Sequence, residues 1–344
     1  MRTRDAERAP TPARVVEHAR LVERLGYDFY YVPEHYLNAI HGPREGVLDA
    51  WVVSAACVAA TERLRVITAV QPGFKAPGVV AKMGATLAGF RPNGFGLSLL
   101  AGWWRLEVEN YDDVWLPHAE RYARASEYLD VIRGFWSKDV FDFKGDYYRV
   151  EAGLLEPKPT PLPPVFVAGE SERAIELAAR AGEYLFINGG DPEHVRSLAR
   201  KAKGLAADRY GRELKIALSA FGVVRASLAE ARAVVDGFRS RADVATIAYF
   251  REQMDGAVVA HNRPSELALE ANLGLDSGLV GDPASILERL QALEEAGADA
   301  VMLKGEPAFE ETERFARDVL APYRAAARAR GTRPSAPTGL SAKP

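Results

Sequence analysis

The segment GFGLSLLAGWWRLEVENYDDVWLPHAERYARASEYLDVIRGFW, residues 94–136, joins an apolar strand, an aromatic-rich polar loop and a long helix. Apolar residues recur every three or four positions from Tyr122 to Trp136, so we expect one face of this helix to be buried. His118 and Tyr122 are four residues apart and share a face of the first turn, where unpaired backbone N–H groups favour an anion. A strand whose carboxyl end delivers polar groups to a ligand is the usual active-site geometry of α/β proteins.

The same strand-then-helix order repeats along the chain, and its apolar strands are typical of a parallel sheet buried on both faces. The seven predicted strands are 27–32, 64–70, 95–101, 165–169, 184–188, 215–225 and 299–305. This count favours a (β/α)8 TIM barrel over a doubly wound sheet. A complete barrel needs one more strand before Pro12, and MRTRDAERAPT has no strand pattern, so we expect the first strand to be missing.

We expect one domain over residues 1–330, with insertions at about 103–117, 140–164 and 241–280. Within the second insertion, DFKGDYYRVE (142–151) predicts a hairpin that turns at Lys144-Gly145. The third insertion, about 241–280, is expected to be a long irregular section between two helices. The tail 331–344, GTRPSAPTGLSAKP, is rich in Pro, Ser and Gly and is expected to be disordered.

The composition excludes several classes of function. The chain is 48% hydrophobic with a formal charge of -3, and it has no basic run, so we expect no nucleic-acid partner. It has no run of 18 apolar residues and no signal peptide, which favours a cytoplasmic protein without a membrane partner. The single Cys57 is read as a packed core thiol. Metal, phosphate-loop and nucleophile-elbow motifs are absent, and no metal site is predicted.

Two further stretches could bind a ligand. The strand VFVAG breaks at Gly169-Glu170-Ser171 and enters a helix, which makes a cradle of N–H groups suited to a phosphate. On local sequence alone, an ordinary helix cap remains the alternative. Four aromatic residues that crowd one loop either line an apolar pocket or bury a subunit interface: Trp103, Trp104, Tyr111 and Trp115.

The chain resembles the bacterial-luciferase-like flavin monooxygenases. The resemblance covers about residues 12–324 and rests on the combination of NGFGLSLLAGWW, HAERY, FKGDYYRVE and EPKPTPLPPVFVAGES. Within that family it looks most like the reduced-FMN-dependent group that oxygenates small organosulfur compounds, the dimethylsulfone and alkanesulfonate monooxygenases. The resemblance implies a (β/α)8 barrel that binds FMNH2, adds O2 at the flavin C4a to form a peroxyflavin, and oxygenates a small-molecule substrate. An NAD(P)H-dependent flavin reductase would supply the FMNH2, and we expect a homo-oligomer.

The resemblance also implies roles for individual residues. His118 and Tyr122 would contact the flavin phosphate or ribityl chain, and the Gly169–Ser171 turn would bind the phosphate. Ser98, Ala101 and Gly102 would lie beside the flavin. The cofactor-binding residues are therefore predicted to be Ser98, Ala101, Gly102, His118, Tyr122, Gly169, Glu170 and Ser171. The predicted substrate pocket comprises Gln71, Trp103, Asn188 and Phe221, and His35 is the only candidate for a catalytic base.

Several positions depart from the family pattern. Ser98 and Ala101 stand where the family has Asn and Ser or Thr, and Ala119 replaces an acidic residue. Ser219-Ala220-Phe221 replaces the Arg-x-His of the alkanesulfonate enzymes, and Asn188 replaces a Trp. Without that cationic pair a sulfonate would lack its counter-charge, so we expect a neutral substrate such as a sulfone.

Two alternatives share the fold. A deazaflavin-dependent oxidoreductase is suggested by the Glu34-His35 pair after strand 27–32, because it resembles the Glu-His pair that ends the second strand of hydride-transferring relatives. A non-catalytic barrel subunit is suggested by Ser98, Ala101 and the missing first strand.

Overall fold

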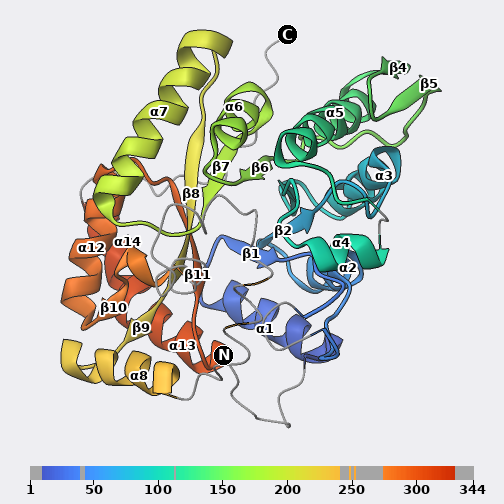
Figure 1. Ribbon diagram of the computed structural model, residues 1–344. Coiled ribbons are helices and arrows are strands. Elements are labelled where there is room, and N and C mark those ends of the chain that lie inside the picture. Colours follow the sequence, from blue (N-terminus) through green and yellow to red (C-terminus); the bar gives the residue numbers. More distant parts are fainter. Residues whose placement is uncertain are drawn as a thin grey trace.

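The computed structural model describes residues 10–38, 43–111, 114–240, 248, 252 and 274–329 (Figure 1). Within these ranges, one sheet of seven strands runs in the order β1-β2-β3-β6-β7-β8-β11, and all neighbours are parallel. The strands are β1 Phe29–Val32, β2 Arg65–Val70, β3 Phe95–Leu99, β6 Val165–Ala168, β7 Tyr184–Ile187, β8 Lys215–Phe221 and β11 Ala300–Lys304. This nearly closed barrel confirms the predicted fold class.

Helices follow the strands and form the outer layer of the barrel (Figure 1). They are α1 Pro12–Arg24, α2 Ala50–Ala60, α3 Pro77–Gly89, α4 Arg105–Tyr111, α5 His118–Ser137, α6 Glu172–Ala181, α7 Pro192–Tyr210, α8 Leu228–Ser240, α12 Pro283–Glu295, α13 Ala308–Phe315 and α14 Ala321–Ala329. A π-helical segment, Ala316–Leu320, joins the last two. No described helix has the length and apolarity needed to cross a membrane.

The apolar strands are buried on both faces, as expected for a parallel sheet enclosed by helices. Every residue of β2, β3 and β7 is buried. The barrel interior is filled by a separate cluster of side chains, Ile67, Phe166, Tyr184, Phe186, Ala217 and Met302. Cys57 lies in the outer core with no exposed surface, and burial raises its pKa to about 11, as suits an inert packed thiol.

The barrel has an open seam between β1 and β11, which are not paired with each other in the described part of the chain. Helices close this seam from outside. His18 of α1 contacts the Tyr30 hydroxyl at 3.2 Å and Thr312 of α13 at 3.1 Å, and the Tyr27 hydroxyl donates to the Thr312 carbonyl at 3.0 Å. The two ends of the sheet are therefore joined through side chains in place of a strand.

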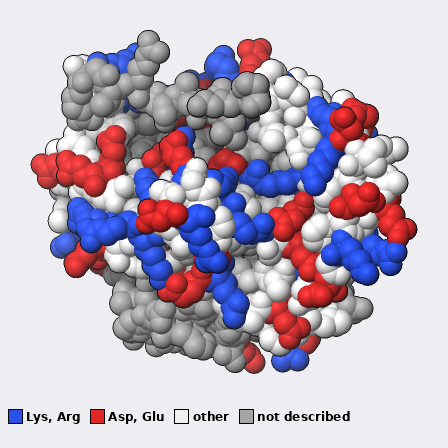
Figure 2. Space-filling view, turned by 90° about the horizontal axis from the view of Figure 1, so that it is seen from above, with Lys and Arg blue, Asp and Glu red and all other residues white. Residues whose placement is uncertain are grey.

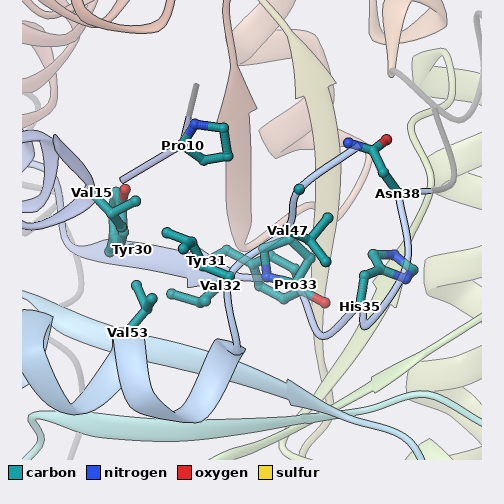
Figure 3. A pocket seen from close by; sticks show the side chains of 12 residues that line it. Pro10, Val15, Tyr30, Tyr31, Val32, Pro33, His35, Asn38, Val47 and Val53 are labelled. Carbon is teal, nitrogen blue, oxygen red and sulfur yellow. The ribbon is translucent and has the colours of Figure 1, made fainter. Parts of the chain in front are cut away.

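A cavity of about 310 Å³ runs along β1 at the seam (Figure 3). Tyr30, Tyr31 and Val32 all line it, although consecutive strand residues point to opposite faces. The cavity must therefore follow the free edge of β1. It extends to His35, the only predicted site residue that lines it.

Local differences from the sequence prediction have physical reasons. The strand expected over 215–225 breaks at Gly222, whose N–H donates to the Lys304 carbonyl, and β9 Val223–Val224 pairs with β10 Val280–Gly281. The aromatic loop contains a helix, α4, that was not predicted. The hairpin is confirmed as β4 Phe141–Lys144 and β5 Arg149–Gly153, which pair antiparallel. The tail 331–344 and most of the insertion 241–280 lie outside the described residues.

Acidic and basic side chains are mixed over the face shown in Figure 2. This distribution agrees with the formal charge of -3 and presents no single-sign surface on that face. The described residues also contain no group of three or more His, Cys, Asp or Glu side chains that could hold a metal ion.

Candidate functional site

The turn after β6 and the start of α5 meet at one point. Gly169 has φ +132°, and a Cβ on it would lie 2.6 Å from the Tyr122 hydroxyl, so only glycine fits there. Ser171 caps α6 by accepting the Ala174 N–H at 3.2 Å, and its side chain is hydrogen-bonded to Tyr122. The sequence predicted these two stretches to share a ligand, and the structure brings them into contact.

An imidazole and two arginines lie near this point. The His118 ring is tilted against the Tyr122 ring, with ring centroids 5.0 Å apart, on the first turn of α5. The pKa of His118 is lowered by partial burial and by the charges of Arg121 and Arg173. Arg173 belongs to the first turn of α6 and is exposed. The sequence analysis did not single it out, because one arginine in a helix usually reads as a surface residue.

Glu170 turns away from the cradle. One carboxylate oxygen accepts the Asn188 N–H at 3.1 Å, and the other contacts Nε2 of His194 at 2.9 Å. The two oxygens therefore bind the turn to the residue after β7 and to the first turn of α7. Any phosphate contact at this position is left to the backbone, as the sequence analysis expected of the turn.

A second group of predicted residues follows β2 and β3. Gly102 has φ +93°, and a Cβ there would lie 3.7 Å from Oε1 of Gln71 and from Arg121 Cδ. Gln71 Oε1 and Ser219 Oγ are buried without a hydrogen-bond partner in the described structure. Buried polar atoms normally have partners, so these two atoms suit the polar edge of a bound ligand.

Ser98 and Ala101 lie deeper than expected. The Ser98 hydroxyl is fully buried inside the barrel, 3.3 Å from the Tyr31 hydroxyl. Ala101 is 8% exposed and packs in the main hydrophobic core. Of the three residues predicted on this strand and its end, Gly102 is the one beside Gln71.

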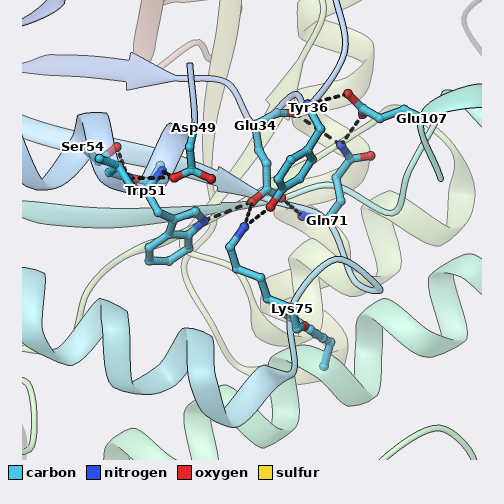
Figure 4. Close-up of polar contacts among 11 residues, drawn as sticks. Glu34, Tyr36, Asp49, Trp51, Ser54, Gln71, Lys75 and Glu107 are labelled. Carbon is cyan, nitrogen blue, oxygen red and sulfur yellow. Dashed lines mark hydrogen bonds and ion pairs between the residues drawn. The ribbon is translucent and has the colours of Figure 1, made fainter. Parts of the chain in front are cut away.

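The adjacent Glu34 and His35 have different side-chain partners, and Figure 4 shows those of Glu34. Glu34 is 3% exposed and accepts hydrogen bonds from Trp51 Nε1, the Gln71 N–H and Lys75 Nζ at 3.2, 2.7 and 2.8 Å. It therefore joins β1 to the outer helices. His35 instead places Nδ1 3.2 Å from both carboxylate oxygens of Glu107.

Glu107 is a buried residue that no sequence pattern indicated. It lies on α4, is 0% exposed, and accepts the N–H groups of Tyr36 and Leu37 at 2.8 and 3.1 Å. Trp103 lies edge-on to the His35 ring at 5.8 Å. The aromatic loop thus packs onto the end of β1 and supplies a buried carboxylate to it.

The other aromatic residues of this loop have different surroundings. Trp104 is fully buried, and the Tyr111 ring lies 4.8 Å from that of Tyr36. Trp115 lies under the Arg121 guanidinium at 4.0 Å. The loop therefore contributes both Trp103 and Trp104 to the His35 region, whereas Tyr111 and Trp115 pack on Tyr36 and Arg121.

The predicted pocket residue Phe221 lies on β8, and a lysine that was not predicted lies beside it on β11. Phe221 ends β8, is 6% exposed and packs 6.0 Å from the Phe238 ring of α8. Lys304 is in register with Phe221 and alternates with the interior residues Ala300 and Met302, so it points into the barrel mouth. Its side chain keeps accessible surface there, while the surrounding protein desolvates it and lowers its pKa to about 8.

Comparison with known proteins gives a consistent result. The sequence profile of the family described as luciferase-like monooxygenase matches residues 2–300. An FMNH2-dependent dimethylsulfone monooxygenase of Pseudomonas putida is 32% identical over 312 residues, which cover 88% of this chain and 85% of the relative. A riboflavin lyase crystal structure with modified FMN and riboflavin has a TM-score of 0.80 at 19% identity, covering 96% of this chain and 87% of the other.

An F420-dependent secondary alcohol dehydrogenase has a TM-score of 0.74 at 20% identity and covers 91% of this chain and 96% of its own. At such identities the two structures support the fold alone. The profile match and the relative at 32% identity, which spans most of both chains, go further. This chain belongs to the luciferase-like monooxygenase family.

Proposed function

We propose that the protein is an FMNH2-dependent monooxygenase that binds its flavin across the carboxyl ends of the barrel strands. The contact between the Tyr122 hydroxyl, Gly169 and Ser171 carries this proposal. It places a glycine-lined helix N-terminus beside His118 and Arg173, which is a phosphate-binding arrangement. The relative at 32% identity is named for its use of FMNH2, and this supports the same cofactor.

The residues present fit FMN at both of its ends. Ser171, His118 and Arg173 would bind the phosphate, with Tyr122 holding Ser171 in place. The buried, unpartnered Gln71 Oε1 lies beside Gly102, where a hydrogen-bonding ring edge would satisfy it. Reduced FMN would supply the activation of O2 for oxygen transfer, and the protein would orient it and exclude water. A flavin reductase would deliver the reduced cofactor.

We infer a small, neutral organosulfur substrate. Ser219 and Phe221 provide no cationic pair for a sulfonate, and the neighbouring strand β11 contributes one lysine, Lys304. A single ammonium group can hydrogen-bond a sulfone oxygen without the paired charge that an anionic head group favours. The relative from Pseudomonas putida is named for dimethylsulfone, which is therefore the first substrate to test.

Anaerobic titration followed by flavin fluorescence tests the cofactor. We expect micromolar binding of FMNH2 and no comparable binding of reduced deazaflavin. The double variant Ser171→Ala/His118→Ala should weaken FMNH2 binding at least about tenfold, or about 1.4 kcal/mol, because it removes two phosphate contacts. Reduced riboflavin lacks the phosphate, so its affinity should be equal in the wild type and the double variant.

Arg149→Ala is the control, because this side chain is 67% exposed on the hairpin β4–β5. It should bind both flavins like the wild type. Equal losses of FMNH2 and riboflavin affinity in the double variant would remove His118 and Ser171 from the phosphate site. Absence of binding by any flavin would overturn the enzymatic proposal and favour a non-catalytic barrel subunit, which Ser98 and Ala101 first suggested.

The deazaflavin alternative was suggested by the Glu34-His35 pair after β1, which resembles a pair in hydride-transferring relatives. In the structure Glu34 contacts Trp51 and Lys75, His35 contacts Glu107, and Gln71 donates to both Glu34 and Glu107. The relative at 32% identity is named for FMNH2, which is therefore the cofactor to test first.

We also infer a homo-oligomer. Val52 of α2 is 71% exposed and Val79 at the start of α3 is 53% exposed. Apolar side chains at such exposure are suited to burial by another chain. Light scattering of the purified protein measures the assembly, and Val52→Lys should shift it toward the monomer.

A further inference from the structure

We propose that Glu107 is a positioning residue that fixes the proton of His35 on Nδ1 and leaves Nε2 as a proton acceptor at the barrel mouth. This inference rests on the proposed function, because it assigns His35 a task in the reaction. Its basis is the arrangement of hydrogen bonds around the buried Glu107 carboxylate, part of which is drawn in Figure 4.

Each oxygen of Glu107 has a defined set of donors. Oε1 accepts the backbone N–H groups of Tyr36 and Leu37 at 2.8 and 3.1 Å. Nδ1 of His35 lies 3.2 Å from both Oε1 and Oε2, and Nε2 of Gln71 donates to Oε2 at 3.4 Å. A carboxylate only accepts hydrogen bonds, so the proton between the two side chains belongs to Nδ1.

The other ring nitrogen is then the acceptor. In neutral imidazole, protonation of Nδ1 leaves a lone pair on Nε2. Nε2 makes no hydrogen bond with a residue that the structure describes, and the His35 side chain is 26% exposed at the end of the seam cavity (Figure 3). A ligand in the mouth can therefore reach Nε2 while Nδ1 remains bonded to Glu107.

The hydrogen bond to Glu107 does not depend on whether Nε2 carries a proton. When Nε2 takes a proton from a group bound in the mouth, Nδ1–H still points at the Glu107 carboxylate. The proton can return from Nε2 without movement of the ring.

The variant Glu107→Gln separates the tautomer from the fold. The two backbone N–H groups at Oε1 hold the amide oxygen of the new side chain at that position, because an NH2 group there would face two donors. The NH2 group then occupies the Oε2 position, 3.2 Å from Nδ1 of His35, where a protonated Nδ1 would face another donor. This moves the ring proton to Nε2 and removes the acceptor from the mouth.

Nitrogen-15 NMR of histidine-labelled, flavin-free protein measures the tautomer directly. The chain has six histidines, and His35→Gln identifies the signal of His35. We expect the Nδ1–H tautomer in the wild type and the Nε2–H tautomer in Glu107→Gln. An Nε2–H tautomer in the wild type would overturn the proposal, even if the variant failed to fold.

Steady-state kinetics with FMNH2 from a reductase and dimethylsulfone as the probe substrate provide the second measurement. We expect Glu107→Gln to lower kcat about a hundredfold or more, the usual range for loss of a positioned acid or base, with KM and FMNH2 affinity retained. An unchanged kcat in a variant with the flipped tautomer would also overturn the proposal.

Glu183→Gln is the matched control. Glu183 is another largely buried carboxylate that accepts a backbone N–H, from Val165 at 2.7 Å, but it lies at the amino ends of β6 and β7. It should lower the melting temperature and leave both kcat and the His35 tautomer unchanged. If the wild type binds no flavin and oxygenates no substrate, the proposed function fails, while the NMR measurement still tests Glu107.

Discussion

The barrel mouth holds two carboxylate–imidazole pairs of different construction. In the first, the Glu107 side chain is 1% exposed and contacts Nδ1 of His35, whose side chain is 26% exposed. In the second, the Glu170 side chain is 13% exposed and contacts Nε2 of His194, which is 35% exposed. The first pair joins α4 to the end of β1, and the second joins the turn after β6 to the start of α7.

The ring nitrogen that each carboxylate engages separates their roles. His35 is held through Nδ1 and keeps Nε2 available. His194, in the first turn of α7, instead uses Nε2 to hold Glu170. The first pair is therefore suited to moving a proton, whereas the second holds the Gly169–Ser171 turn in place.

The largest expected difference between the pairs is in stability. Glu107→Ala leaves the N–H groups of Tyr36 and Leu37 buried without an acceptor, and we expect it to lower the free energy of unfolding by about 3 kcal/mol. Glu170→Ala removes one backbone hydrogen bond at a wetter site and should cost about 1 kcal/mol. Urea denaturation of the flavin-free variants measures both values, and equal losses would contradict the distinction.

Activity should separate the two histidines almost as strongly. We expect His35→Gln to lower kcat about a hundredfold, because it removes the proton acceptor at the mouth. His194→Gln should leave kcat near the wild-type value, because an amide can still donate to Glu170. Initial rates under saturating FMNH2 and substrate provide the comparison. A larger loss in His194→Gln than in His35→Gln would reverse the assignment of the pairs.

The sequence predicted the strands well because each is a continuous apolar run. It also predicted the meeting of His118, Tyr122 and the Gly169–Ser171 turn, since strand ends and helix starts share one end of a parallel barrel. The proximity of Glu34 and His35 in sequence was misleading. Consecutive residues after a strand point to opposite sides, so one joined Trp51 and Lys75 and the other joined Glu107.

Glu107 could not be found from local patterns. It belongs to RLEVENY, a seven-residue helix too short to show a clear period, and a charged residue there usually faces water. Its burial depends on two N–H groups about 70 positions earlier in the chain. Lys304 was missed for a related reason, because its place in the mouth follows from the register of β11 with β8.

Lys304 of β11 belongs to neither carboxylate–imidazole pair. It has the smallest expected effect and provides the most specific test. Desolvation disfavours its charged form and lowers its pKa from 10.5 to about 8, so the ammonium group that could donate to a substrate oxygen is lost as the pH rises through 8. We expect the KM of the wild type to rise up to about tenfold between pH 7 and pH 9, the worth of one charge-assisted hydrogen bond.

Two variants separate this effect from other titrations. Lys304→Met should show the high KM at both pH values, because it never donates. Lys304→Arg should keep a lower KM up to pH 9, because a guanidinium stays protonated. A wild-type KM that does not change with pH, or a Lys304→Met variant that keeps the pH dependence, would place Lys304 away from the substrate. The neutral substrate would then have to be oriented by the side of the mouth that carries His35 and Trp103.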